Sequence, residues 1–220
     1  MLSITVFYFI LGDLMAKRVE EISEKLLDCA KKEFLENGFK DASLRNIAEN
    51  AGSSTGAIYI RYPDKEALFD DLVLETIELF FSHFRDAQDA HFKLVDQKKT
   101  DTSKDLSQSY LNQFISYIYD HYDVFKLVLC CSSGTKYENF IHELVDLEVN
   151  VAEQYFAKLR EISKLEGYVS REVHHMLTSA YYTAIFEIVV HDMSKGNAED
   201  YIEQVSTFFT TGWNGLLKFV

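Results

Sequence analysis

Apolar residues recur every three or four positions along most of this chain, which is the pattern of helices that bury one face. The first such stripe consists of Val19, Ile22, Leu26, Ala30 and Phe34. Gly38 follows it, and glycine readily adopts the left-handed conformation that ends a helix. We therefore expect a helix up to Asn37, with Phe39 folding back on its last turn.

Two short helices are predicted next, each with a serine as N-cap. Ser43 starts the first, whose inward positions are Leu44, Ile47, Ala48 and Ala51. Gly52 ends it, and Ser54 starts the second. The second helix must stop at Tyr62, because Pro63, the only proline of the chain, disfavours helical geometry in the residue before it.

The rest of the chain predicts a longer helical body. Asp64 caps a fourth helix with apolar positions Leu68, Leu72, Ile77, Phe80 and Phe84, and the polar residues 93–105 read as a loop or frayed end. Further helices are expected over 106–119, 121–131, 137–159, 170–191 and 199–219, with residues 195–197 separating the last two. One proline and nine glycines are too few for an all-β chain, so we expect an all-α fold of about nine helices, the first three short.

The net charge of -13 does not exclude a nucleic-acid partner, because the charge is unevenly distributed. Residues 15–65 hold nine basic and nine acidic side chains, whereas residues 66–220 hold 13 and 25. The local balance decides whether a surface can approach phosphate. Three cysteines without paired spacing argue against a disulfide framework and favour a cytoplasmic protein.

Residues 1–14 contain an apolar run, but neither a positive segment before it nor a cleavage site after it supports a signal peptide. Met15 resembles a natural start, so residues 1–14 are expected to be an extra segment that is not native. An arm packed on the body and an arm that reaches a partner are the alternatives. No stretch approaches the ~18 apolar residues of a membrane span, so no membrane contact is expected.

Small residues suit the crossing of the two short helices, namely Ala48, Ala51, Gly52, Gly56 and Ala57. Two short helices joined by a glycine turn match the helix-turn-helix motif, which places its last helix in the major groove of DNA. The same spacing also occurs in helical proteins that bind no DNA. Spacing alone therefore leaves both readings open.

The residues themselves closely resemble the N-terminal signature of the tetracycline-repressor (TetR) family of bacterial transcription regulators. The shared elements are Ile47-Ala48, Ala51-Gly52, Ser54, Gly56, Tyr59, Tyr62 and Lys65-Glu66-Ala67-Leu68. Ser53 and Arg61 depart from the pattern, which often has an apolar residue and a histidine there. The resemblance implies a DNA-binding domain over residues 15–64 and a helical ligand-binding and dimerisation domain over residues 65–220.

Given this resemblance, the candidate DNA contacts are Ser43, Arg45, Ser53, Ser54, Thr55, Gly56, Tyr59, Arg61, Tyr62 and Lys65. Ser43 and Lys65 lie at helix starts, where phosphates bind. Thr55 and Arg45 are placed to reach base edges, and Ile58 is expected in the core. The implied partner is a pseudo-palindromic, double-stranded operator.

Aromatic residues crowd the middle of the chain. Those expected to line an apolar effector pocket are Phe84, Tyr110, Phe114, Tyr117, Tyr122, Phe125 and Tyr155. Aromatic stripes also build cores, so each residue can serve either role. Glu148 falls off the apolar stripe and is expected to be exposed. The last two helices of two chains are expected to form a four-helix bundle, giving a homodimer.

The sequence thus predicts a regulator, in the usual mode a repressor that a small hydrophobic or aromatic effector releases from DNA. A helical small-molecule-binding protein without specific DNA binding is the alternative. An enzyme is not expected, because Cys130-Cys131 near His121 reads as buried packing. His174-His175 point about 100° apart on a helix and make a poor chelate, so no metal or cofactor is expected.

Overall fold

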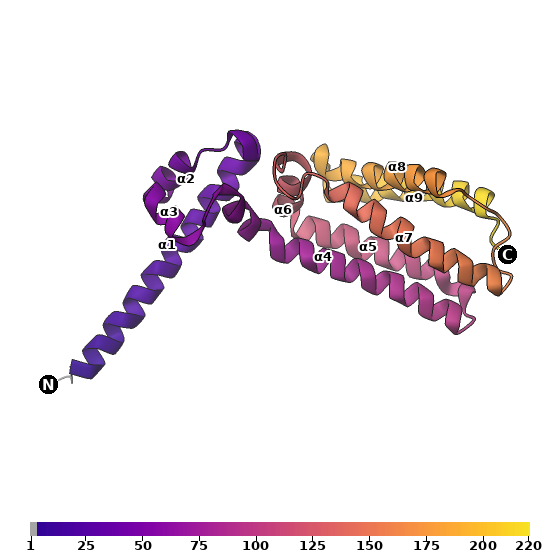
Figure 1. Cartoon of the computed structure of the whole chain (residues 1–220), viewed down its shortest axis with the longest axis horizontal. Helices are drawn as coiled ribbons and strands as arrows, with labels where there is room; N and C mark the ends of the chain where they lie inside the picture. The colour runs from indigo at the N-terminus through magenta and orange to yellow at the C-terminus, as the bar shows by residue number, and fades with distance from the viewer. Residues whose placement is uncertain (1–3) are drawn as a thin grey trace.

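The computed structural model describes residues 4–220, with side chains from Ser23 onward, and this range is all-helical apart from one isolated β-bridge. The first three helices form a head at one end of the molecule: α1 (Ile4–Asp41), α2 (Leu44–Ala51) and α3 (Thr55–Arg61). The body contains α4 (Lys65–Asp96), α5 (Ser103–Asp120), α6 (Tyr122–Lys126), α7 (Phe140–Glu161), α8 (Arg171–Val190) and α9 (Lys195–Leu217) (Figure 1). The predicted all-α fold and its nine helices are confirmed for these residues.

The first helix is longer than predicted, because α1 already begins at Ile4 and runs through residues 4–14 without a break. In Figure 1 its N-terminal part projects away from the rest of the chain. The predicted apolar positions Val19 and Ile22 lie outside the described side chains. Further along the same stripe, Leu26 and Ala30 are buried, as predicted.

The predicted end of this helix at Gly38 is confirmed by the backbone. Gly38 has φ 71° and ψ 166°, a conformation that side-chain-bearing residues rarely adopt, and it kinks α1 three residues before its end. Phe39 turns back as expected, and its ring stacks on Phe34 with 6.0 Å between centroids.

The predicted caps of the head are also confirmed. Ser43, Ser54 and Asp64 each accept a hydrogen bond from the backbone N–H three residues further on. Gly52 ends α2 in the left-handed region at φ 68°, and Tyr62 ends α3 in an extended conformation, as the following proline requires. The proline therefore sets the corner between α3 and the long helix α4.

Two predicted boundaries in the body are wrong. Residues 195–197 are not a break but the first turn of α9, because the Ser194 side chain accepts a hydrogen bond from Asn197 N and caps the helix there. The predicted loop over residues 93–105 is shorter than expected. Helix α4 continues to Asp96, α5 begins at Ser103, and only a short turn and a 3₁₀ segment lie between them.

An aromatic cluster occupies the centre of the body. Phe80 on α4 lies 5.3, 5.9 and 6.4 Å, between ring centroids, from Phe125, Phe140 and Phe186 on α6, α7 and α8. All four rings are buried. Pairs at these distances contribute beyond their buried area, so this cluster fixes how the four helices pack.

The chain end is held on the loop before α8 by backbone hydrogen bonds. Gly167 N donates to Leu217 O at 2.7 Å, and Leu165 forms an antiparallel bridge with Phe219. A Cβ on Gly167 would lie 2.1 Å from Leu216 O and 2.5 Å from Leu217 C, which is closer than real atoms approach. The position therefore requires glycine.

We expect Gly167→Ala to lower the free energy of unfolding by about 2–4 kcal/mol, because the backbone of the α9 end must move away. Urea unfolding followed by circular dichroism measures the change. Gly196→Ala is the matched control, since a Cβ there meets nothing within 4 Å and the residue is helical. Equal stability of the two variants would contradict the prediction.

Candidate nucleic-acid interface

A buried carboxylate fixes the short helix α2 on α1. Glu33 is only 7 % exposed, and its Oε1 accepts hydrogen bonds from Ser43 N at 2.9 Å and Asn46 Nδ2 at 3.4 Å. Ile47 and Ala48 are buried on the inner side of α2. The start of α2 is therefore held in place by one side chain from α1.

Helix α3 presents an exposed face of mixed character. Ile58 is fully buried, which confirms its predicted core role, while Tyr59 is 56 % and Ile60 86 % exposed. Gly56 at the start of the helix is exposed as well. An exposed tyrosine and isoleucine on a short helix give a surface that can both donate hydrogen bonds and touch apolar groups.

The sequence analysis missed Ile60 as a surface residue. Two residues apart on a helix, Ile58 and Ile60 point about 200° apart, so they cannot both face one core. That signal was present in the sequence. It marks the side of α3 opposite to the core as the face available to a partner.

The other predicted contacts in the head differ in how exposed they are. Ser54 and Arg61 are exposed at the two ends of α3, while Ser53 and Thr55 are partly buried. On α2, Arg45 is exposed and its Nε donates to Glu49 Oε1 at 2.8 Å. This ion pair is worth little in solvent, so Arg45 can exchange Glu49 for a phosphate at small cost.

Two predicted DNA contacts are engaged within the protein. Tyr62 donates its hydroxyl hydrogen to Asp71 Oδ2 on α4 at 2.6 Å, and burial together with this carboxylate raises the pKa of Tyr62 to about 12. Lys65 Nζ donates to the carbonyl oxygens of Lys40 and Ala42, both at 3.0 Å. These contacts tie α3 and the end of α1 to α4. They join residues up to 25 positions apart, which no local motif reveals.

The first turns of α4 are also fixed to the body. Asp70 accepts hydrogen bonds from the Tyr137 hydroxyl and from Lys136, whose Nζ lies 2.6 Å away. Burial alone would raise the pKa of Asp70, but these two partners outweigh it and lower the pKa. Lys136 N donates to Glu66 Oε1 at 3.0 Å. The segment before α7 thus holds α4 where it leaves the head.

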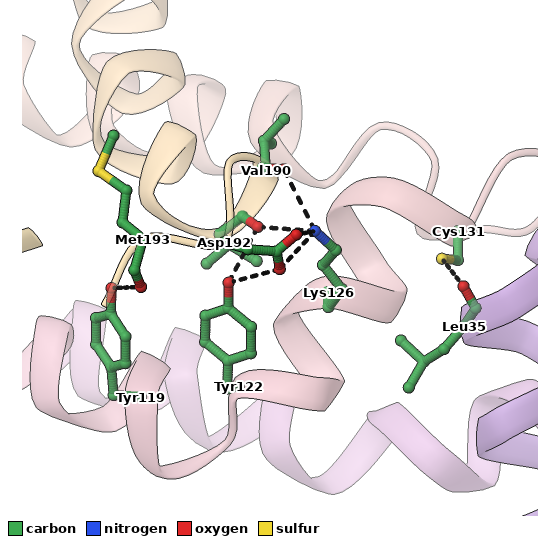
Figure 2. A network of polar contacts seen from close by, with 9 residues as sticks. Leu35, Tyr119, Tyr122, Lys126, Cys131, Val190, Asp192 and Met193 are labelled. Atoms are coloured by element: carbon green, nitrogen blue, oxygen red, sulfur yellow. Dashed lines mark hydrogen bonds and ion pairs between the residues drawn. The ribbon is translucent and has the colours of Figure 1, made fainter. Parts of the chain in front are cut away.

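A second polar network ties the end of α8 to α5 and α6 (Figure 2). Lys126 Nζ lies 2.8 Å from both carboxylate oxygens of Asp192, and the Tyr122 hydroxyl donates to Asp192 Oδ1 at 3.1 Å. The Tyr119 hydroxyl donates to Met193 O at 2.9 Å. Tyr122, predicted to line an effector pocket, instead belongs to this network.

The network continues to the head through η2 (Leu127–Cys131), a short π-helical turn that packs on α1. Cys131 is buried, and its thiol faces Leu35 O at 3.9 Å (Figure 2). Cys130 is exposed, so the expectation that both cysteines are buried is wrong for this one. The geometry gives a continuous path of contacts from α8 through α6 and η2 to α1.

One hollow in the body gathers part of the predicted ligand set. It lies between α4 and α5, has a volume of about 350 Å³ and is lined by His83, Asp86, Tyr110, Gln113, Phe114, Ser116, Tyr117 and Asp120. Phe84 lies behind it, 5.8 Å from Phe114 between ring centroids. Phe125 belongs to the central core, and Tyr155 lies elsewhere, against Phe92.

The prediction that Glu148 is exposed is wrong. Glu148 lies mostly buried on α7, and its Oε2 accepts a hydrogen bond from Gln88 Nε2 on α4 at 2.9 Å. Burial raises the pKa of Glu148, although the Gln88 bond and His91 act in the opposite direction. Burial raises the pKa of the neighbouring Tyr182, and the Glu148 carboxylate raises it further. The helical pattern failed here because α4 covers the polar side of α7.

We expect Glu148→Gln to raise the melting temperature at pH 7.5 by about 2–4 °C, the shift that 1 kcal/mol produces in a chain of this size. A carboxyl whose folded pKa is raised stabilises the fold at pH values below its ordinary pKa of 4.5, and this contribution is lost as the pH rises through the folded pKa. The difference between Glu148→Gln and wild type should therefore shrink toward pH 4. Thermal melts from pH 4 to 8 test this, with the exposed Glu143→Gln as control; a lower melting temperature at pH 7.5 would contradict it.

The last two helices carry several exposed apolar residues. The large ones are Val173, Met176, Val190, Phe208 and Leu216, with exposed fractions from 40 % to 74 %. On α9, Phe208 and Leu216 border a shallow hollow of about 600 Å³, together with Thr207, Thr211, Gly212 and Gly215. Exposed apolar residues that gather around a hollow, as on α9, are typical of a surface that binds a partner.

Comparison with known proteins places the helix-turn-helix segment in a known group. A protein-family model described as "Bacterial regulatory proteins, tetR family" matches residues 26–72. The HTH-type transcriptional repressor KstR2 of Mycobacterium tuberculosis is 31% identical over 78 residues, which are 36% of this chain and 39% of KstR2. The HTH-type transcriptional regulator UidR of Escherichia coli is 31% identical over 74 residues, 34% of this chain and 38% of UidR. The matched region thus spans only about two fifths of each relative.

The fold resembles a solved structure over most of its length. NalD of Pseudomonas aeruginosa, the secondary repressor of the MexAB-OprM multidrug efflux pump, aligns over 86% of this chain and 96% of its own, with 18% identity and a TM-score of 0.50. At this identity the likeness shows the fold alone. Among the helices that the structure describes, none combines the length and apolar character that a bilayer span requires.

Proposed function

Because this chain is a member of the tetR family of bacterial regulatory proteins, we propose that it is a homodimeric transcription repressor that binds a specific DNA operator and leaves it when a small molecule binds the body. The observation that carries this proposal is the exposed face of α3, held on a supported helix-turn-helix at one end of the molecule. The family assignment agrees with the prediction that the chain is not an enzyme.

In the proposed complex, α3 enters the major groove. Tyr59, Ile60 and Thr55 would face base edges and the sugar-phosphate chain, and Ile60 is suited to the methyl group of thymine. Ser43, Ser53, Ser54 and Gly56 lie at the starts of α2 and α3, where backbone N–H groups can hold phosphates. Arg45 and Arg61 supply positive charge beside them. Tyr62 and Lys65 would act indirectly, by fixing the head on α4.

The proposed dimer forms through α8 and α9, whose exposed apolar residues support a two-fold, self-complementary contact. Two heads bind successive major grooves only when they are about 34–36 Å apart. Movement within the body would be passed to the heads through Lys126, Asp192 and the η2 segment. A ligand that shifts these contacts would change the spacing of the heads and release the DNA.

We propose a small hydrophobic or aromatic effector, supported by the aromatic side chains that gather around the hollow between α4 and α5. Tyr110, Phe114 and Tyr117 offer ring faces to such a molecule. Asp86 and Asp120 on the same rim disfavour an anionic one. We also expect the protein to act in the cytoplasm, where its operator would lie.

The test is fluorescence anisotropy with DNA fragments from around the protein's own gene, in the presence of nonspecific competitor and across a salt series. A repressor gives saturable binding that survives competitor and weakens steeply with salt. The alternative, a helical small-molecule-binding protein without specific DNA binding, predicts that no fragment survives competitor. Repeating the measurement after unfolding and refolding removes any bound effector, so failure after this step would reject the proposal.

A further inference from the structure

Two histidines and one aspartate from α7 and α8 meet at the surface of the body. His142 and Asp146 lie one turn apart on α7, and His175 lies on α8. One ligand atom from each lies within 4.8 Å of the other two. In the part of the chain with described side chains, this is the only group of three or more potential metal ligands that lie so close together.

The separations fit a metal ion. His142 Nε2 lies 3.5 Å from Asp146 Oδ2, and His175 Nε2 lies 3.4 Å from Asp146 Oδ1. In a tetrahedral zinc site with bonds of about 2.0–2.1 Å, neighbouring ligand atoms are about 3.3–3.4 Å apart. The two nitrogens face different oxygens of the Asp146 carboxylate, and the imidazole rings have centroids 5.6 Å apart at an angle of 69°, so one ion is held either by both oxygens or after a rotation of the carboxylate.

We propose that His142, Asp146 and His175 bind a divalent transition-metal ion of the zinc type. Two imidazole nitrogens and a carboxylate oxygen are the ligands that Zn²⁺ and its neighbours in the series prefer over Mg²⁺ or Ca²⁺. Three protein ligands leave one position for water or another small ligand. All three side chains are partly exposed, with exposed fractions between 35 % and 63 %, so an ion can reach them from solvent.

The two helices supply this set because they pack along each other. Adjacent histidines do diverge on α8, as the sequence predicted: His174 is buried against Phe156 and Trp213, whereas His175 turns toward α7. No local motif indicates that His175 meets residues of α7, since His142 and His175 are far apart in the chain. A bound ion would bridge α7 and α8 and oppose their separation.

The competing reading is a cluster of ion pairs in which Asp146 faces two histidines and binds no metal. Isothermal titration of the metal-free, full-length protein with ZnCl₂ separates the two. We expect the wild type to bind one Zn²⁺ per chain. The affinity of His142→Ala and of His175→Ala should each be lower by at least about tenfold, because each variant has lost one ligand. If the wild type binds no Zn²⁺ at a ZnCl₂ concentration of about 100 µM, the Kd is too high for a useful site and the proposal is overturned.

Two control variants show whether other residues bind the ion. His191→Ala removes an exposed histidine that pairs with Glu187, within one helical turn, and should leave the affinity unchanged. Cys130→Ser removes the exposed thiol and should also leave it unchanged. Equal affinity in the wild type and in both His142→Ala and His175→Ala would overturn the proposal, since the ion would then bind elsewhere.

A second readout is thermal stability. At a free Zn²⁺ concentration of about 100 times the wild-type Kd, the melting temperature of the wild type should rise by about 5–10 °C, and that of His175→Ala by no more than about 3–6 °C, because its tenfold weaker site is less saturated. Because neither measurement uses DNA, failure of this proposal is distinguishable from failure of the proposed repressor function. An equal rise in both proteins would overturn it.

Discussion

Replacing Phe208 by glutamate is expected to convert the proposed dimer into monomers and to weaken binding to the proposed operator by at least about 100-fold. Phe208 is 74 % exposed in the single chain and borders the hollow on α9. At a two-fold contact the same substitution appears on both subunits, so two carboxylates would lose water and face each other across an apolar surface. Each head would then bind a half-site alone and lose the second binding event.

Light scattering at micromolar concentration measures the first effect and anisotropy with a full operator measures the second. Folding should be unaffected, because the side chain is exposed in the monomer, and circular dichroism checks this. Leu79→Glu is the matched control, since Leu79 is another exposed apolar residue, 45 % exposed, but on α4. A Phe208→Glu protein that retains the mass of a dimer would contradict the interface.

Local signals in the sequence were sufficient for the helix boundaries of the head between Gly38 and Asp64, although not for the start of α1. Serine and aspartate caps, a left-handed glycine and a proline each act within four residues, so their geometry follows from the residues themselves. The predicted helix start at residue 170 also agrees with the structure, in which Ser170 caps α8. The same reasoning failed at residues 195–197, where a glycine in the first turn was read as a break although Ser194 caps the helix.

Side-chain roles were harder to predict wherever they depend on distant parts of the chain. Glu148 is buried because α4 passes over it, and Lys65 is engaged because the end of α1 places two carbonyl oxygens beside it. Helical periodicity states which residues share a face, but not what covers that face. The aromatic residues show the same limit: one pattern produced both the central core around Phe80 and the hollow beside Tyr110.

Tyr59 on α3 and Tyr62 directly after it give a decisive comparison, because removing the same hydroxyl from each should have different consequences. Tyr59 is exposed on the face proposed to meet DNA, whereas Tyr62 uses its hydroxyl on Asp71. Tyr59→Phe should lower operator affinity by about tenfold, the effect of one hydrogen bond to a charged group, and leave the melting temperature unchanged. Tyr62→Phe should lower the melting temperature by about 2–4 °C and reduce operator affinity less than Tyr59→Phe does.

Anisotropy and thermal melts of both variants measure the four values. Ile60→Ala extends the comparison to the apolar part of the face: loss of a thymine-methyl contact should reduce affinity for the operator by about 5–100-fold and leave nonspecific binding almost unchanged, because nonspecific binding depends on phosphates. If Tyr62→Phe lost operator affinity at full thermal stability while Tyr59→Phe did not, the reading face of α3 would lie on the side of Tyr62. The head would then have to rotate about α3 relative to the groove, and Asp71 would compete with DNA for the Tyr62 hydroxyl.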